Sequence, residues 1–274
     1  MTQIASLAGS KTNELADLAL KITARIWFFV AVIGQWIFGS YVLALYGRSA
    51  VGGNLEAWNQ AMPHGYVAGD TMGNLAIGIH LFLAVLILFG GPLQFVPRIR
   101  VQWPRFHHWN GRLYMLAVLL ASLAGLYMVW TRGAAGGFIQ HVGISFDAVL
   151  IIVFGAIALW RAINRNIDAH RRWIFRLFMA VSAVWFFRVG LMFWIFSNGG
   201  PAGFDPETFE GPFLSFLTFS QYLVPLFFLE IYFYVQDNAG AIGRFLMASC
   251  LLVLTVAMSI GIFVATFGMW LPYF

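Results

Sequence analysis

Long apolar stretches separated by short polar segments dominate this chain. A helix needs about 20 mostly apolar residues to cross a bilayer, and seven segments meet that requirement. They run approximately over residues 25–46, 73–96, 108–131, 140–161, 172–196, 213–236 and 244–270. Their apolar residues are continuous instead of alternating, which excludes a transmembrane β-barrel. The pattern predicts an all-α polytopic membrane protein with a single transmembrane domain, 25–270, after a polar, partly amphipathic lead-in over 1–24.

The composition agrees with this class. Hydrophobic residues make up 61% of the chain and charged residues only 10%, whereas a soluble domain carries about 25% charged residues. Too few polar residues are present to cover a soluble surface, so a soluble enzyme is excluded. A disulfide scaffold is excluded as well, because Cys250 is the single cysteine.

Basic residues alternate sharply between the connections. Most of the 16 lysines and arginines fall in the N-terminal segment, the 97–112 loop and the 161–176 loop, while the opposite loops are richer in acidic residues. The positive-inside rule makes the arginine-rich side cytoplasmic. We therefore expect a bacterial inner-membrane protein with its N-terminus inside and its C-terminus outside. The asymmetry explains the pI of about 9.6, so a nucleic-acid partner is not expected.

Histidines fall on four consecutive spans, the second to the fifth. His80 and His141 lie toward the outer face, and His107, or its neighbour His108, lies with His170 toward the inner face. A low-spin b-type haem takes two imidazoles from facing helices of a bundle. The pattern predicts a four-helix core that binds haem b between His107 and His170, with a second haem between His80 and His141. Five interfacial hydrogen-bonding histidines are the alternative.

Other residues bear on this haem hypothesis. Gly111 follows His107 on the same helical face, and Gly78 and Gly90 flank His80, which would leave room for a macrocycle. Basic residues near the inner pair could neutralise propionates: Arg112, Arg171 and Arg172. A covalent c-type haem is excluded because the chain has no C-x-x-C-H motif. His80 lies about five residues deeper than His141, or roughly 7 Å by helical rise, which weakens the outer pair.

Four ionisable residues lie inside the spans, where a charge usually faces inward with a partner. Their depths match in two pairs, Asp147 with Arg188 and Arg176 with Glu230. We expect two ion pairs that fix the helix packing. A propionate clamp, a proton path or a substrate site is the alternative.

Three segments resemble the bacterial membrane proteins of domain-of-unknown-function family 2306 (DUF2306). They are GIHLFLAVLILFGGPLQF (78–95), HHWNGRLYM (107–115) and HRRWIFRLFMAVSAVWFFR (170–188). The family pattern maps onto His80, then His107 with Trp109, Gly111 and Arg112, then His170 with Trp173, Arg176 and Arg188. His108 stands where the family has arginine, which leaves the choice of ligand open. The function of that family is not established.

The histidine order is also similar to that of the cytochrome b-561 class, whose members bind one haem near each membrane face. This likeness covers topology and histidine placement only, and His141 is not part of the first family's pattern. Together these features favour a transmembrane b-type cytochrome for electron transport, with a quinone or small reductant as partner. One alternative is a cofactor-free accessory subunit of a larger membrane complex. Another is a transporter or sensor, although no broken helix is expected from the sequence.

Overall fold

The computed structural model describes residues 2–62, 64–133 and 135–273, with side chains from residue 11 onward. The described residues contain no β-strand, only an isolated bridge between Asp205 and Glu210. The helices are α1 (Thr2–Val42), α2 (Arg48–Val51), α3 (Thr71–Leu93), α4 (Pro97–Gln102), α5 (Pro104–Thr131), α6 (Phe138–Ile163), α7 (Ile167–Val181), α8 (Ala183–Asn198), α9 (Pro212–Asn238) and α10 (Ala241–Ala265). The chain is therefore all-α, as predicted.

The predicted spans are present as helices. Six described helices are long and apolar enough to cross a membrane, and the pair α7 and α8 makes a seventh if the two count as one bent span. The lead-in is not a separate element, because residues 2–24 and the first span form the continuous helix α1. This helix is extended further by a π-helical turn, Leu43–Gly47, and by α2.

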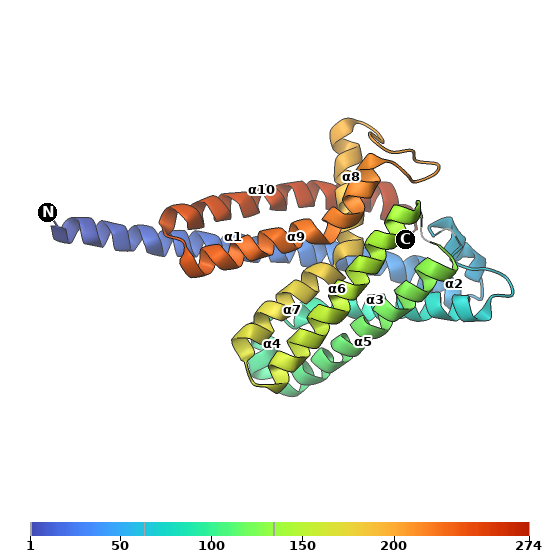
Figure 1. The fold of residues 1–274 in the computed structure, drawn as a ribbon, viewed down its shortest axis with the longest axis horizontal. Coiled ribbons are helices and arrows are strands. Elements are labelled where there is room, and N and C mark those ends of the chain that lie inside the picture. The colour runs from blue at the N-terminus through green and yellow to red at the C-terminus, as the bar shows by residue number, and fades with distance from the viewer. Residues whose placement is uncertain (1, 63, 134, 274) are drawn as a thin grey trace.

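The helices pack in two groups (Figure 1). In the first, α3 packs on α5, α5 on α6 and α6 on α7, while in the second α10 packs on both α1 and α8. Helix α9 contacts α6, α7 and α8 and so joins the groups. The N-terminus and α4 lie toward one end of the molecule, whereas α2 and the C-terminus lie toward the other (Figure 1). The first group carries five of the six histidines, all except His64.

Local sequence explains where the helices of the first group begin. The side chain of Asp70 accepts a hydrogen bond from the Gly73 amide at the start of α3, and Asn166 does the same for Ala169 at the start of α7. Both residues are typical N-caps, which satisfy amides that have no partner within the helix. Helices α4 and α5 begin at Pro97 and Pro104, a residue type suited to the first helical turn.

The fifth predicted span is broken, contrary to expectation. Helices α7 and α8 meet at Ser182 with a bend of 52°. The Ser182 hydroxyl donates to the Phe178 carbonyl at 2.7 Å and accepts a hydrogen bond from the Gln35 amide nitrogen at 2.8 Å. A serine hydroxyl that bonds the carbonyl four residues back bends a helix. The number of apolar residues in a segment does not reveal this bend. The break also contains neither proline nor glycine, the residues that usually mark one in a sequence.

Candidate functional site

Helices α5 and α7 bring two of the predicted ligands into one region, at the ends that the positive-inside rule predicts to be the inner ends. His107 lies in the first turn of α5 and His170 in the first turn of α7. The two imidazoles are close enough to interact electrostatically. His107 also interacts electrostatically with His108 and Arg100. The structure thus places the two histidines in the same region, on the side where arginines are concentrated.

Hydrogen bonding leaves ring nitrogens of both histidines available. Nδ1 of His170 lies 2.8 Å from the Ala158 carbonyl oxygen of α6. An Nδ1–H group that donates to this carbonyl leaves the lone pair on Nε2, as in most metal-binding histidines. Nδ1 of His107 is buried and has no hydrogen-bond partner among the described residues. His108 is exposed, with its ring centroid 5.9 Å from that of His107.

The unpartnered polar atoms continue along one face of α5. His107, Gly111 and Tyr114 follow each other at helical spacing, and the hydroxyl of Tyr114 is also buried with no described partner. Gln94, from the segment after α3, lies against Gly111, with Oε1 3.2 Å from where a Cβ would be. Its Nε2 is buried and unpartnered too. Buried polar groups of native proteins are rarely left unsatisfied, so this face is the candidate binding site.

A recess in the surface adjoins this face. It holds about 230 Å³ between α3 and α5 and is lined mainly by apolar residues, with Asn110 and Tyr114 at its wall. Leu113, another lining residue, is 47% exposed, which indicates that the recess opens on the side of the helices that faces lipid.

The three glycines do not leave the expected space. The side chain of Trp58 lies against Gly78, that of Asn110 against Gly90 and that of Gln94 against Gly111. These glycines therefore admit neighbouring side chains, and the prediction that they clear a slot for a macrocycle is wrong in this conformation.

The three arginines differ in their engagement. Arg172 forms an ion pair with Asp237 at 2.6 Å and lies over the ring of Phe233. Arg112 lies over its neighbour Trp109 at 5.2 Å, and Arg171 is exposed. Arg112 and Arg171 are thus the residues with charge available to an anionic group.

The outer histidines contact different parts of α5 and of the segment that follows it. Nδ1 of His80 lies 2.9 Å from the Ala121 carbonyl oxygen of α5, with Gly125 beside the ring. His141 lies against Trp130, near the end of α5, and against Gly133, which follows this helix. Gly125 and Trp130 are five residues apart in α5, or about 7.5 Å by helical rise. The two histidines therefore contact α5 at different levels, and the outer pair stays a prediction.

One of the two expected ion pairs is present. Arg176 donates to both carboxylate oxygens of Glu230, at 2.6 and 2.8 Å, and so ties α7 to α9.

The other expected pair, Asp147 with Arg188, is absent from the described residues. Asp147 is 7% exposed and lies beside Tyr222 of α9, with its Oδ1 unpartnered. Arg188 lies over Phe38 of α1 instead. The two residues have similar predicted depths but do not form a pair, because Asp147 contacts α9 and Arg188 contacts α1.

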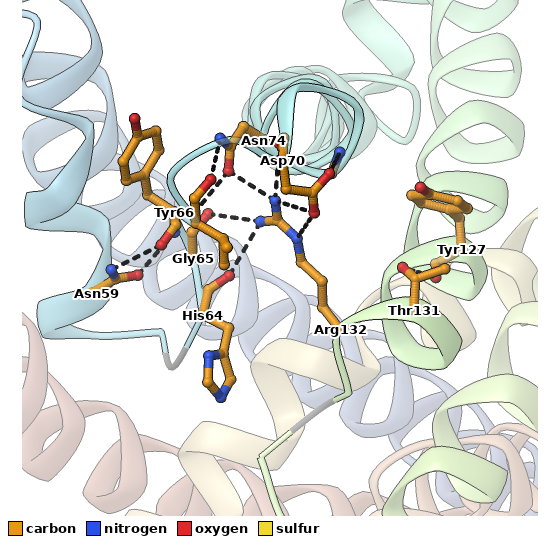
Figure 2. A network of polar contacts seen from close by, with 11 residues as sticks. Asn59, His64, Gly65, Tyr66, Asp70, Asn74, Tyr127, Thr131 and Arg132 are labelled. Carbon is orange, nitrogen blue, oxygen red and sulfur yellow. Dashed lines mark hydrogen bonds and ion pairs between the residues drawn. The ribbon is translucent and has the colours of Figure 1, made fainter.

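The outer end carries a polar network that sequence reasoning missed (Figure 2). Arg132, after α5, donates to the Asp70 carboxylate at 2.7 and 2.9 Å, to Asn74, and to the His64 and Gly65 carbonyls. The Arg132 side chain is only 6% exposed. Every nitrogen of its guanidinium is engaged, so the network clamps the outer loop to α3 and α5 and offers no ligand site. An acidic N-cap and an arginine just after a span are the only sequence signals for it.

Fold and composition together define the class, an all-α polytopic membrane protein. Residues 77–204 match the model of a family described as predicted membrane protein (DUF2306). This range contains α5, α6, α7, His80, His107, His170 and Arg188, and the match confirms the resemblance seen in the sequence motifs. No curated protein and no solved structure matches the chain. Within the described residues, no group of three or more histidine, cysteine or acidic side chains could hold a metal ion.

Proposed function

We propose that this protein is a transmembrane b-type cytochrome-like electron carrier that binds one haem at the inner ends of α5 and α7. The carrying observation is the row of buried, unpartnered polar atoms beginning at His107, next to a His170 whose Nδ1 is tied to a carbonyl. A pair of imidazoles from separate helices is the ligand set of low-spin haem. The outer histidines are left out of the proposal, since they lie at different levels of α5.

The residues present fit a haem by the chemistry of their donors. His107 and His170 would hold the iron, with the Ala158 carbonyl orienting the His170 ring. Arg112 and Arg171 would balance the charge of the propionates. When bound, the haem would supply a one-electron redox centre. The side chain of Gln94 would supply a hydrogen bond at the site.

The proposed electron donor is a lipid-soluble quinol. The recess between α3 and α5 brings lipid-accessible space to Asn110 and Tyr114, one and two turns beyond His107. Tyr114 has a hydroxyl without a partner in the described chain, which could bond a quinol oxygen. The proposal also places the protein in a bacterial inner membrane with the arginine-rich end in the cytoplasm.

A difference spectrum tests the haem. Protein purified after expression with ample haem should show low-spin bands in its reduced-minus-oxidised spectrum. His107→Ala and His170→Ala should each abolish these bands, because each removes one axial ligand. Thermal unfolding of each variant shows whether loss of colour reflects loss of the fold.

Two matched controls define the ligand. His108→Ala alters the exposed neighbour of His107, and His64→Ala alters an exposed histidine of the outer loop; both variants should keep the bands. Loss of the bands in His108→Ala alone would assign the iron to that residue. A colourless wild-type protein would contradict the proposal and favour an accessory subunit or a transporter.

A further inference from the structure

Arg188 carries a positive charge in the outer half of the second helix group. Its guanidinium lies 5.1 Å from the ring centroid of Phe38 in α1 and donates to the Val184 carbonyl at 3.0 Å. Among the described residues no carboxylate forms an ion pair with it, since the pairs there involve Arg132, Arg172, Arg176 and Arg244. A charge inside a membrane is costly unless something compensates it.

Among the described residues, the polar groups around Arg188 are hydrogen-bond donors, and none of them is a carboxylate. The hydroxyls of Tyr41 and Tyr46 lie within hydrogen-bonding reach of each other, and both tyrosines interact electrostatically with Arg188. Trp270 packs on Phe38 and Tyr41, with ring centroids 5.3 and 6.4 Å apart. Its side chain is fully buried, yet its indole N–H has no hydrogen-bond partner in the described chain.

A second indole repeats the pattern one turn away. Trp185 precedes Arg188 by three residues, so both side chains lie on one face of α8. Its ring approaches Gly34, one turn before Phe38 in α1. The residue is 1% exposed, and its N–H is also unpartnered among the described residues. Two orphaned N–H donors and an uncompensated guanidinium thus border one stripe of α1.

The backbone is irregular where it supplies this cluster. Tyr46 lies in the π-helical turn Leu43–Gly47 and Trp270 in the π-helical turn Thr266–Trp270. Single π-helical turns inside long helices are rare and often mark functional sites. Here both turns bring a side chain to the neighbourhood of Arg188, from helices far apart in the sequence.

We infer that this cluster, formed by Tyr41, Tyr46, Trp185, Arg188 and Trp270, binds a small monovalent inorganic anion such as chloride. A single anion would neutralise the guanidinium and accept hydrogen bonds from the two indole N–H groups, which have no partner among the described residues. Arg188 is partly exposed while the aromatic residues around it are buried, so an ion can reach it. The close packing of the rings favours an ion of one or a few atoms. This inference does not depend on the haem proposal.

Thermal unfolding in different salts tests the site. Purified protein is heated in sodium chloride, sodium gluconate or sodium acetate at constant ionic strength. Chloride should raise the midpoint of thermal unfolding by several degrees, and the increase should saturate with chloride concentration. Gluconate is too large for the proposed site and should not raise the midpoint. Arg188→Gln should abolish the chloride effect. The matched control Arg98→Gln, which removes an exposed arginine of α4, should retain it.

Fluorescence keeps the test decisive if Arg188→Gln does not fold. Bromide should quench a fraction of the tryptophan emission saturably, chloride should compete with it, and Trp270→Phe should reduce that fraction. Equal midpoints in chloride and gluconate, stabilisation by acetate alone, or bromide quenching that rises linearly without competition would each overturn the inference.

Discussion

At the residue scale, Arg132 and Asp70 make up a buried charge and its partner at the outer end. The Gly73 amide and then the Arg132 guanidinium hold the pKa of the Asp70 carboxyl below its usual range. Arg132 is buried and Asp70 is 41% exposed, so losing the carboxylate would leave the arginine as an uncompensated buried charge. The contact therefore belongs to stability and not to binding.

Asp70→Asn should lower the midpoint of thermal unfolding by several degrees near neutral pH. Asparagine is as good an N-cap as aspartate, so the change removes the charge and keeps the cap. Because the folded pKa of Asp70 is lowered, its stabilisation is complete above the unfolded pKa of about 3.9 and is lost as pH falls through the folded pKa. Unfolding midpoints of both proteins should therefore differ equally at pH 5 and 7 and converge below about pH 4. A gap that persists unchanged at pH 3 would contradict this role.

Residue contacts were only partly predictable from the sequence. The inner histidines could be found because both open a helix at the same membrane face, and Arg176 with Glu230 because their depths match. Depth alone could not reject Asp147 with Arg188, since a pair also needs helices that are neighbours and turned toward each other. The levels of the outer histidines could not be predicted for a related reason, because the position of each along α5 depends on how α3 and α6 shift against it.

At the element scale, the second helix group is held by close approach at small residues. A Cβ on Gly261 of α10 would collide with the Val189 backbone carbonyl of α8, and one on Gly34 of α1 would lie 2.7 Å from Trp185. Membrane helices commonly associate through such positions, where small residues let backbones come together. The apolar spans could be predicted from the run of about 20 residues that a bilayer demands. The interlocking glycines and the bend at Ser182 could not, because they depend on the neighbouring helix.

Gly261→Ala should destabilise the protein by about 1–3 kcal/mol, the usual cost of overfilling a packed interior. The clash is with backbone, which cannot turn aside as a side chain can. Gly78→Ala in α3 is the matched control, since its Cβ would meet only Trp58, at 3.5 Å, and alanine favours the helix. Denaturant or thermal unfolding in detergent compares the two variants. A control as unstable as Gly261→Ala would show that any glycine replacement in a span is harmful.

At the scale of the whole molecule, charge and shape agree on two distinct ends. The arginine-rich α4 and the loop between α6 and α7 belong to the end that would face the cytoplasm, and the Arg132 network clamps the other (Figures 1 and 2). The proposed haem site and the proposed anion site lie toward opposite ends and in different helix groups. Which membrane face each site is near depends on the orientation of the protein in the membrane. The positive-inside rule predicts that orientation from the charges of the loops alone.

Cysteine labelling tests this orientation. Single cysteines are introduced at Arg100, Arg165 and Glu207, all exposed, in a Cys250→Ser background that removes the native thiol. An impermeant thiol reagent applied to intact cells should label position 207, in the loop between α8 and α9, because that loop lies outside. Positions 100 and 165 should react only after the membrane is permeabilised, since arginine-rich loops stay in the cytoplasm. The reverse labelling pattern would show that the protein has the opposite orientation in the membrane. His107 and His170 would then lie at the outer face, and the proposed haem would receive its electrons from outside.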